Sequence, residues 1–193
     1  MIIGLVGFIG CGKGTVADIL VRDYGYQKFS FADALKDAVA LLFGWPRNLL
    51  EGDTDESRLF RETPDAFWSK KFGYTVTPRY ILQRFGTEAM RDVMNKDIWV
   101  HTLERRIQGL ENVVIPDTRF ENEIQFIKNA GGKMIWVKRG VMPNAEEVAK
   151  MHISERAWLG QGVDNVIHND GTFNDLTQEV RSVLTFHSKQ DII

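Results

Sequence analysis

Residues 7–15 read GFIGCGKGT, directly after the apolar run IIGLV at 2–6 and directly before the helix-forming run VADILV at 16–21. This order predicts a strand that enters a glycine-rich loop and then a helix. Glycines let the backbone turn tightly, so that several amide N–H groups face one anion. The N-terminus of the following helix adds its positive dipole end. We therefore interpret the stretch as a phosphate-binding loop.

Within this loop Lys13 supplies a full positive charge for the β- and γ-phosphates, and the Thr15 hydroxyl suits Mg²⁺ or a phosphate oxygen. The common form of the loop has Ser or Thr immediately after the lysine, whereas here Gly14 intervenes. This variant resembles the loop of nucleoside monophosphate kinases, which favours phosphoryl transfer to a small acceptor over GTPase switches and motor ATPases. The expected ATP ligands in the loop are Gly10, Cys11, Gly12, Lys13, Gly14 and Thr15, with Thr15 also holding the metal.

Composition limits the classes of protein to consider. A length of 193 residues suits one domain, and a net charge of −2 gives no sign of the basic stripe that nucleic acid needs. The single cysteine, Cys11, excludes an intramolecular disulfide and favours a reducing cytoplasm, with its backbone N–H as the part that matters. No apolar run approaches membrane-spanning length. We expect small-molecule nucleotides as partners, with no nucleic acid and no membrane. We also expect a cytoplasmic location, which is the host cytoplasm if the gene is phage-encoded.

Strand-like and helix-like segments alternate along the chain. This pattern predicts an α/β fold with a mostly parallel sheet and helices on both faces. The expected strands are 2–6, 26–31, 112–115, 133–138 and 163–168, and the expected helices are 15–24, 32–43, 78–95 with a break near Gly86, 98–107, 120–129 and 172–187.

Two stretches, 47–77 and 140–162, are irregular and bear short helices. We predict one domain over residues 1–193, in which 47–77 is an acceptor-binding insertion rather than core and 140–162 is a lid. In parallel sheets the ligand lies beyond the carboxyl ends of the strands. Residues that follow the strands are therefore expected to converge on one crevice.

Arginines suit a phosphate site because their planar fork grips phosphate in a bidentate manner. Arg119 lies just past a buried strand end, and Arg79 lies in the first turn of a helix beginning at Pro78, so we assign catalytic roles to Lys13, Arg79 and Arg119. Arg139 follows the fourth strand and is expected at the ATP. Arg58 and Arg61 share a helical face. One of them is expected at the acceptor phosphate, and the alternative is a surface ion pair with Asp55 or Glu62.

Three acids have open roles. Asp117 ends an apolar strand, where it could order Mg²⁺, orient Arg119 or contact the acceptor. Asp33 has the same ambiguity, with capping of the next helix as the alternative. Glu123 lies four residues after Arg119, where it could form a helix-surface pair or recognise a sugar or base.

Trp99 lies in an apolar helix, so it belongs either to the core or to a base-stacking platform. The histidines lack metal-ligand spacing, and we expect no zinc site.

With these residues identified, the chain resembles the deoxynucleoside monophosphate kinases of tailed phages over nearly its whole length. The matching pieces are the loop through Asp18, residues 31–38 (FADALKDA), Leu82-Gln83-x-Phe85-Gly86-Thr87, Trp99-Val100, Pro116-Asp117-Thr118-Arg119 with Glu123, His152-Ile153-Ser154-Glu155 and Asn169-Asp170-Gly171. The resemblance implies a P-loop fold of three α/β/α layers. It also implies a deoxynucleotide pocket that we list as Asp33, Lys36, Arg58, Arg61, Arg79, Gly86, Thr87, Trp99, Asp117, Arg119 and Glu123.

These features together predict an ATP- and Mg²⁺-dependent kinase that makes deoxynucleoside diphosphates and prefers deoxynucleotides to ribonucleotides. Two alternatives remain: another small-acceptor P-loop kinase, such as a dephospho-coenzyme A kinase, and a non-catalytic nucleotide-binding regulator. The sequence does not decide which bases are accepted, nor between a monomer and a homodimer.

Overall fold

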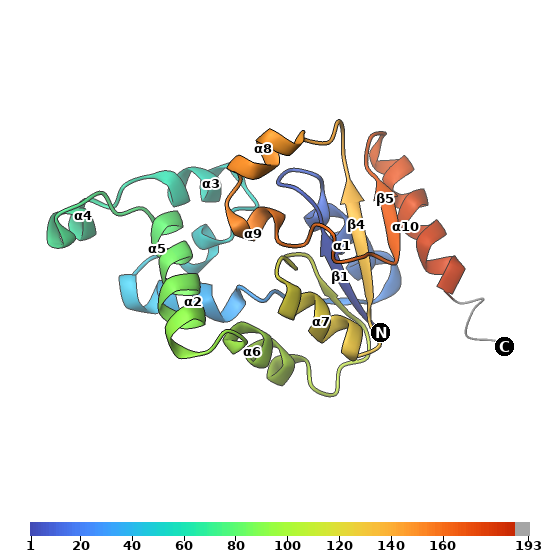
Figure 1. Cartoon of the computed structure of the whole chain (residues 1–193), viewed down its shortest axis with the longest axis horizontal. Coiled ribbons are helices and arrows are strands. Elements are labelled where there is room, and N and C mark those ends of the chain that lie inside the picture. Colours follow the sequence, from blue (N-terminus) through green and yellow to red (C-terminus); the bar gives the residue numbers. More distant parts are fainter. Residues whose placement is uncertain (188–193) are drawn as a thin grey trace. The chain divides into compact units, whose positions relative to one another are not determined.

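The computed structural model describes residues 1–187 and divides the chain into two compact units (Figure 1). Unit 1 comprises Met1–Ser30 and Ile107–Ile193, of which the structure describes the residues up to 187, and unit 2 comprises Phe31–Arg106. The roles of 47–77 as an acceptor-binding insertion and of 140–162 as a lid stay predictions. None of the helices among the described residues combines the length and apolar character needed to cross a membrane.

Unit 1 is built on a five-stranded sheet in the order β2-β3-β1-β4-β5, and all neighbouring strands are parallel. The strands are β1 (Ile2–Val6), β2 (Gln27–Lys28), β3 (Val113–Ile115), β4 (Lys133–Lys138) and β5 (Asn165–His168). The predicted α/β fold with a parallel sheet is confirmed. The strand expected at 26–31 is shorter than predicted, since only two of its residues pair with β3.

Helices cover both faces of this sheet. Successive side chains of β1 point to opposite faces, so they show which helix covers which face. Ile3 and Leu5 pack in a core cluster with residues of α1 (Lys13–Tyr24) and α10 (Phe173–His187). Gly4, between them, faces α7 (Glu121–Asn129), where a Cβ on Gly4 would lie 2.5 Å from Ile127 Cδ1. Unit 1 therefore has three α/β/α layers, with β1 and its loop at the centre.

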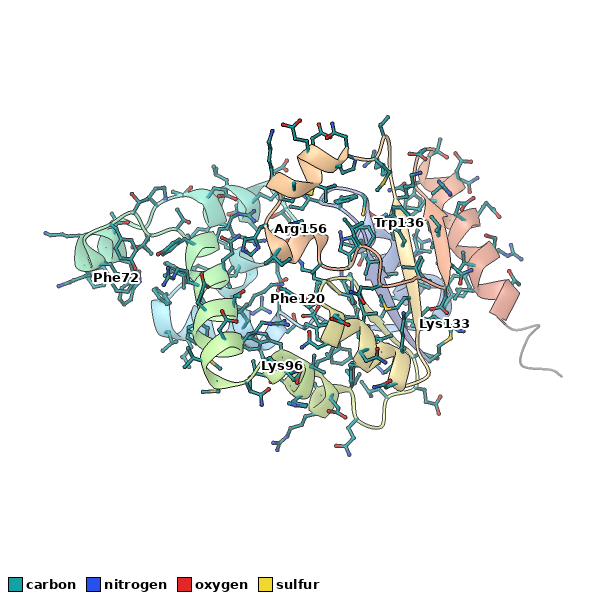
Figure 2. All side chains as sticks on the ribbon, in the orientation of Figure 1. Phe72, Lys96, Phe120, Lys133, Trp136 and Arg156 are labelled. Carbon is teal, nitrogen blue, oxygen red and sulfur yellow. The ribbon has the colours of Figure 1, made fainter. Side chains whose placement is uncertain are left out.

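The segment 140–162 carries α8 (Ala145–Lys150) and α9 (Ile153–Arg156), as its irregular pattern predicted. Its end is anchored by Trp158, which is 5% exposed. The Trp158 ring lies 5.5 Å from the ring of Trp136 and 5.2 Å from that of Phe8, between centroids. Figure 2 labels Trp136 on β4 and Arg156 on α9. The segment thus contacts the strand and the loop that border the predicted site.

The described residues of unit 2 form helices joined by turns and loops, without a strand. Its elements are α2 (Asp33–Phe43), η1 (Arg47–Leu50), α3 (Asp55–Glu62), α4 (Ala66–Phe72), α5 (Pro78–Arg84), η2 (Phe85–Met94) and α6 (Ile98–Ile107), the last residue of which belongs to unit 1. Local sequence explains the ends of several helices. Gly44 stops α2 in a left-handed conformation, with φ of 70°. Thr77 caps α5 through the Tyr80 N–H, and Pro78 occupies the first helical turn.

The stretch 47–77 differs from its prediction, because it supplies core residues. Leu50 and Val76 are fully buried, in one cluster with Val39, Trp45 and Leu82 among others. Aromatic rings extend this cluster toward α4, which ends at Phe72 (Figure 2). The sequence signal was weak because these apolar residues are separated by short helices and turns, so that none of them repeats with a helical period.

The predicted break near Gly86 is a change of helix type. The α-helical hydrogen bonding of α5 gives way at Phe85 to the wider π-helical pattern of η2. Gly86 is buried there, and a Cβ on it would lie 2.8 Å from Leu35 Cδ2 of α2. Trp99 Nε1 donates to the Gly86 carbonyl at 3.0 Å. The glycine permits close packing of η2 against α2.

Candidate active site

The loop at residues 7–15 has the backbone that an anion site requires. Gly10 and Gly12 have φ of 76° and 100°, values that glycine adopts readily. Gly12 is the N-cap of α1, and within the described chain no side chain caps that helix end. The first-turn amide N–H groups therefore lack helical partners, and the positive end of the helix dipole lies with them.

Gly7 at the start of the loop is also constrained. Its φ is 147°, and a Cβ at this position would collide with the Val137 carbonyl oxygen and lie 2.7 Å from Cys11 Sγ. The backbone of the loop thus lies directly against β4. Side chains of any size would displace the loop from the sheet, which explains a glycine here.

Lys13 reaches into the loop. Its Nζ donates to the carbonyls of Gly7 at 2.6 Å and Phe8 at 3.0 Å, and it lies 3.7 Å from Cys11 Sγ. Burial lowers the pKa of Lys13, Cys11 raises it, Arg119 lowers it and Glu155 raises it, and the net pKa is below the ordinary value. A bound phosphate would favour the charged form, because it adds negative charge beside the ammonium. The structure therefore brings Lys13, Arg119 and Glu155 together.

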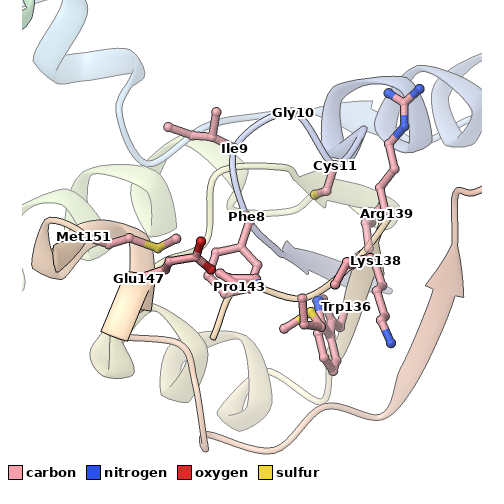
Figure 3. A pocket seen from close by; sticks show the side chains of 13 residues that line it. Phe8, Ile9, Gly10, Cys11, Trp136, Lys138, Arg139, Pro143, Glu147 and Met151 are labelled. Carbon is pink, nitrogen blue, oxygen red and sulfur yellow. The ribbon is translucent and has the colours of Figure 1, made fainter. Parts of the chain in front are cut away.

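A cavity of about 630 Å³ borders the loop. Figure 3 shows Phe8 and Cys11 of the loop, Trp136 and Lys138 of β4, and Glu147 and Met151 of the segment 140–162 along its wall. Arg139 also lines it and is exposed, in agreement with its expected place after the fourth strand. The cavity is large enough for a drug-sized ligand next to the phosphate loop.

The carboxyl end of β3 carries the second group of predicted residues. Ser30 Oγ donates to Asp117 Oδ2 at 2.5 Å. Arg119 Nη1 donates to Glu155 Oε1 at 2.6 Å and lies 3.4 Å from Ser154 Oγ. The Arg119 side chain therefore reaches from the end of β3 to α9, where its guanidinium forms an ion pair with Glu155.

Glu123 corrects one of the alternatives raised above. A pair with Arg119 on the helix surface is wrong, since Glu123 is 4% exposed and its carboxylate accepts the backbone N–H groups of Arg119 at 2.8 Å and Phe120 at 3.0 Å. An acid in the third helical position that reaches back in this way caps the N-terminus of α7. Glu123 thus fixes the backbone of Arg119.

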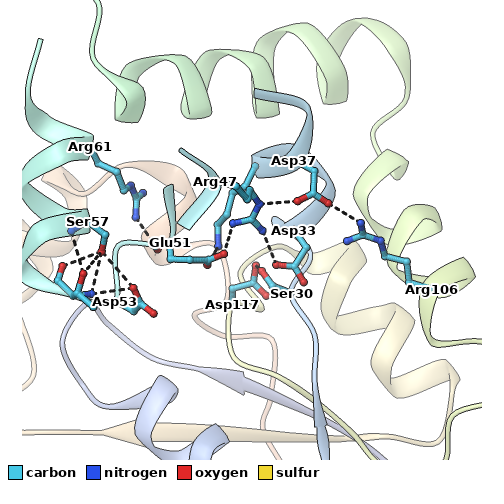
Figure 4. A network of polar contacts seen from close by, with 12 residues as sticks. Ser30, Asp33, Asp37, Arg47, Glu51, Asp53, Ser57, Arg61, Arg106 and Asp117 are labelled. Carbon is cyan, nitrogen blue, oxygen red and sulfur yellow. Dashed lines mark hydrogen bonds and ion pairs between the residues drawn. The ribbon is translucent and has the colours of Figure 1, made fainter. Parts of the chain in front are cut away.

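In unit 2, the predicted acceptor residues Asp33 and Lys36 belong to a group of alternating charges. Figure 4 labels its members Asp33, Arg47 and Glu51. Lys36 Nζ lies 2.6 Å from Glu51 Oε2, and the Lys36 side chain is 13% exposed. Arg47 contacts Glu51, lies 2.6 Å from Asp37 Oδ1 and 3.4 Å from Asp33 Oδ1. Helix α2 has Ala32 as its N-cap, so the capping role considered for Asp33 is wrong.

The pKa values of two acids in this group reflect their cationic neighbours. Burial raises the pKa of Glu51, but Lys36 and Arg47 lower it more, so that the net pKa lies below the ordinary value. Burial likewise raises the pKa of Asp37, and Arg106 and Arg47 bring it below the ordinary value. These acids remain charged at neutral pH and hold the cations in place.

The two arginines of α3 have different surroundings. Arg58 is exposed and lies 2.7 Å from Asp55 Oδ1, which is the surface ion pair considered above. Arg61 is half-buried, and its Nη1 donates to the Glu51 carbonyl at 3.2 Å. Arg79 forms an ion pair with Glu62. Of the pair, Arg61 is the one built into the charged group of unit 2.

The remaining predicted residues lie in η2 and α6. Thr87 is half-buried, beside the buried Gly86, and Trp99 is 7% exposed with its indole N–H bonded to Gly86. This environment fits the core alternative for Trp99. Its role in stacking on a base stays a prediction.

Sequence reasoning missed several residues of these groups: Ser30, Arg47, Glu155 and Asn169, whose Nδ2 donates to the Cys11 carbonyl at 2.9 Å. Glu155 and Asn169 stood within the matching motifs, but nothing in the sequence says what they contact. Arg47 gave one signal, its spacing of four residues from Glu51.

The sequence model of the deoxynucleotide monophosphate kinase family matches residues 60–180. A putative deoxynucleotide monophosphate kinase of Acanthamoeba polyphaga mimivirus is 38% identical over 152 residues, covering 72% of this chain and 74% of the relative. The deoxynucleotide monophosphate kinase of Enterobacteria phage T4 is 23% identical and covers 95% of this chain and 98% of its own. Both relatives are viral.

Among solved structures, shikimate kinase from Aquifex aeolicus has a TM-score of 0.50 at 17% identity and covers 97% of this chain and 98% of that chain. The protein TT1252 from Thermus thermophilus has a TM-score of 0.50 at 21% identity and covers 96% of each chain. These likenesses concern the fold alone and agree with a P-loop kinase fold. The family match over more than half of the chain, with the mimivirus relative, confirms the resemblance, and this chain belongs to the deoxynucleotide monophosphate kinase family.

Proposed function

We propose that this chain transfers the γ-phosphoryl group of ATP to the phosphate of a deoxynucleoside monophosphate, giving a deoxynucleoside diphosphate and ADP. The observation that carries the proposal is the uncapped N-terminus of α1 with Lys13 in its loop, in the same unit as Arg119 and its partner Glu155. Charge in phosphoryl transfer spreads over three equatorial oxygens, and cations beside a helix end suit it. Family membership supports a deoxynucleotide as the acceptor.

On the donor side, the loop amides hold the β- and γ-phosphates, and Lys13 exchanges the carbonyls of Gly7 and Phe8 for phosphate oxygens. Thr15 is an exposed residue in the first turn of α1. Its hydroxyl fits Mg²⁺, which keeps most of its waters and takes few protein ligands. When bound, Mg²⁺ neutralises charge on the phosphate oxygens. We assign the cavity beside the loop, which Arg139 lines, to the rest of the ATP molecule.

On the acceptor side, Arg119 is the main ligand for the phosphate. Its Nη1 donates to the Glu155 carboxylate, and a guanidinium also binds phosphate well, so the acceptor exchanges with this carboxylate. The Asp117 carboxylate, held by Ser30, lies two residues from Arg119 along the chain and orders the same strand end.

The chemistry needs little more than position and charge. An acceptor phosphate oxygen, already anionic, attacks the γ-phosphorus, and the bond from that phosphorus to the bridging oxygen of ADP breaks. No proton must be removed, so no strong general base is required. Lys13 and Arg119 stabilise the charge that develops, which is the main source of rate in such sites.

Lys36, Arg61 and Arg79 of unit 2 are proposed as further acceptor ligands, and Arg58 is the weaker candidate of its pair. Each of the first three contacts an acidic residue: Lys36 through the Glu51 carboxylate, Arg61 through the Glu51 carbonyl and Arg79 through the Glu62 carboxylate. A phosphate can compete for the same donors, because carboxylate and phosphate present similar acceptor oxygens.

The preference for deoxyribose is proposed on family membership. Gly86, which the resemblance places in the deoxynucleotide pocket, lies against Leu35 on the side where a Cβ would stand. Comparing kcat/KM for dGMP with GMP and for dTMP with UMP tests the preference. Equal values within each pair would contradict it.

A coupled ADP-release assay with ATP, Mg²⁺ and a panel of deoxynucleoside monophosphates tests the function itself. We expect at least one deoxynucleotide to be phosphorylated, and dephospho-coenzyme A to be inactive. Activity with dephospho-coenzyme A alone would establish the other small-acceptor kinase. Binding of ATP without transfer to any acceptor would leave a nucleotide-binding regulator.

A further inference from the structure

Asn169 joins the end of the sheet to the phosphate loop. It directly follows β5, and its backbone N–H donates to the Lys138 carbonyl at 2.8 Å, which continues the pairing of β4 with β5. Its side-chain Nδ2 donates to the Cys11 carbonyl at 2.9 Å, between residues 158 positions apart. A Cβ on Gly12 would collide with the same Nδ2, so the amide packs directly on the loop backbone.

This contact determines how one peptide plane of the loop is turned. In a trans peptide, the carbonyl of one residue and the N–H of the next point in opposite directions. Because the Cys11 carbonyl points at Asn169, the Gly12 N–H points away from Asn169. We propose that Asn169 is a positioning residue that turns the Gly12 amide toward the donor phosphates. The proposal rests on the proposed function only in taking ATP as the donor.

The loop needs such an external anchor because of its own composition. Gly10 and Gly12 flank Cys11, and a glycine reaches both signs of φ at little cost, so the peptide between residues 11 and 12 can rotate. The internal bond from the Cys11 N–H to the Phe8 carbonyl is long, at 3.3 Å. Lys13 leaves the carbonyls of Gly7 and Phe8 when it turns to phosphate. The bond from Asn169 remains during that exchange.

Asn169 can act as an anchor because the turn that carries it is held at several points. Asp170 Oδ1 accepts the Gly140 N–H at 2.6 Å. Asp175 Oδ2 accepts the Thr172 N–H at 2.8 Å, where α10 begins. The Asn169 amide therefore comes from a fixed backbone, and Cys11, at 4% exposure, leaves little access for water to replace it.

The test is the affinity for Mg·ATP, and for Mg²⁺ with inorganic tripolyphosphate, measured by calorimetry on the full chain. Asn169→Ala removes the donor, and Asn169→Leu removes it while keeping a similar shape. Both variants should bind each probe about three- to tenfold more weakly, which corresponds to one hydrogen bond. The KM of the accepted deoxynucleoside monophosphate should stay unchanged. Asn129→Ala, an exposed asparagine at the end of α7, is the matched control and should bind both probes normally.

Three results would overturn the inference: normal affinity in Asn169→Ala, recovery of affinity in Asn169→Leu, or equal weakening toward donor and acceptor. Recovery in Asn169→Leu would mean that the side chain serves packing. The two proposals fail separately. Wild-type protein that binds Mg·ATP but phosphorylates no deoxynucleotide contradicts the proposed acceptor, and the comparison of affinities still decides the role of Asn169. Wild-type protein that binds neither probe contradicts both.

Discussion

The phosphate loop of unit 1 and the charged group of unit 2 present cations in two different ways. In the loop, backbone geometry does the positioning: glycines at positive φ, an uncapped helix end and one lysine. In unit 2, side chains position one another: Lys36 and Arg47 are held by Glu51, Asp33 and Asp37. In the loop the anion-facing groups are mainly backbone amides, which need no carboxylate displaced, whereas the cations of unit 2 must exchange carboxylate partners. The difference predicts which substitutions abolish the reaction and which only tune it.

Lys13→Ala should have the largest effect. The lysine is the one full charge inside the backbone site, and removing a group that stabilises transition-state charge costs about 10²–10³ in kcat. Steady-state kinetics with ATP measures it, and Lys28→Ala, an exposed lysine paired with Asp18, is the matched control. Near-normal turnover in Lys13→Ala would mean that the loop backbone suffices for catalysis without the lysine. It would contradict the expectation that substitutions in the loop abolish the reaction.

Arg119→Ala should lower kcat/KM for the acceptor about 10- to 100-fold, the cost of a charge-assisted hydrogen bond, and leave the ATP affinity nearly unchanged. Measuring acceptor kinetics and ATP binding separately shows the split. Arg22→Ala, which removes an exposed arginine paired with Asp23, should change neither. Loss of ATP affinity with a normal acceptor KM would assign Arg119 to the donor side.

Glu51→Gln should lower the free energy of unfolding by about 1 kcal/mol at pH 7, because Lys36 and Arg47 lose a charged partner. The folded pKa of Glu51 lies below its ordinary value of 4.5. Its stabilisation is therefore present above that pH and lost as the pH falls through the folded pKa. Denaturant titrations across this range should show the variant and wild type converging in acid. A constant difference at all pH values would mean that the charge of Glu51 is irrelevant.

Glu155→Gln should have the smallest effect and the opposite direction. It weakens the internal competitor for Arg119, so the KM of the acceptor should fall about two- to fivefold, in keeping with a partly exposed ion pair. Glu146→Gln, a surface acid paired with Lys150, is the control. An increase in KM would show that Glu155 orients Arg119 rather than competing for it.

Local patterns were sufficient wherever a short stretch of sequence determines its own conformation. The strand at 2–6 and the helix at 98–107 have the predicted ends, the helix expected to end at 43 does so, and Pro78 begins a helix as predicted. The glycine loop belongs to the same class in part, since its glycines and the helix after it predicted a phosphate site, whereas the contact of Asn169 with the Cys11 carbonyl depends on the fold. Its role could be interpreted before any contact was known.

Two features were not resolved by the local sequence pattern. Glu123 caps α7 where a surface pair was considered, and Leu50 and Val76 are core where an insertion outside the core was expected. In each case the sequence contains the residue type but not its neighbour. Burial and long-range pairing, which depend on the whole fold, select among the alternatives.

The sequence by itself determined the parallel α/β sheet, the phosphate loop and the family, because glycine conformation, apolar periodicity and an ordered set of motifs are local properties. Only the tertiary structure decided that Glu155 holds Arg119, that Asn169 holds the Cys11 carbonyl and that Lys36 and Arg47 share Glu51. Such hydrogen bonds and ion pairs act over a few ångströms. Which groups come within that range is fixed by the packing of elements far apart in the chain.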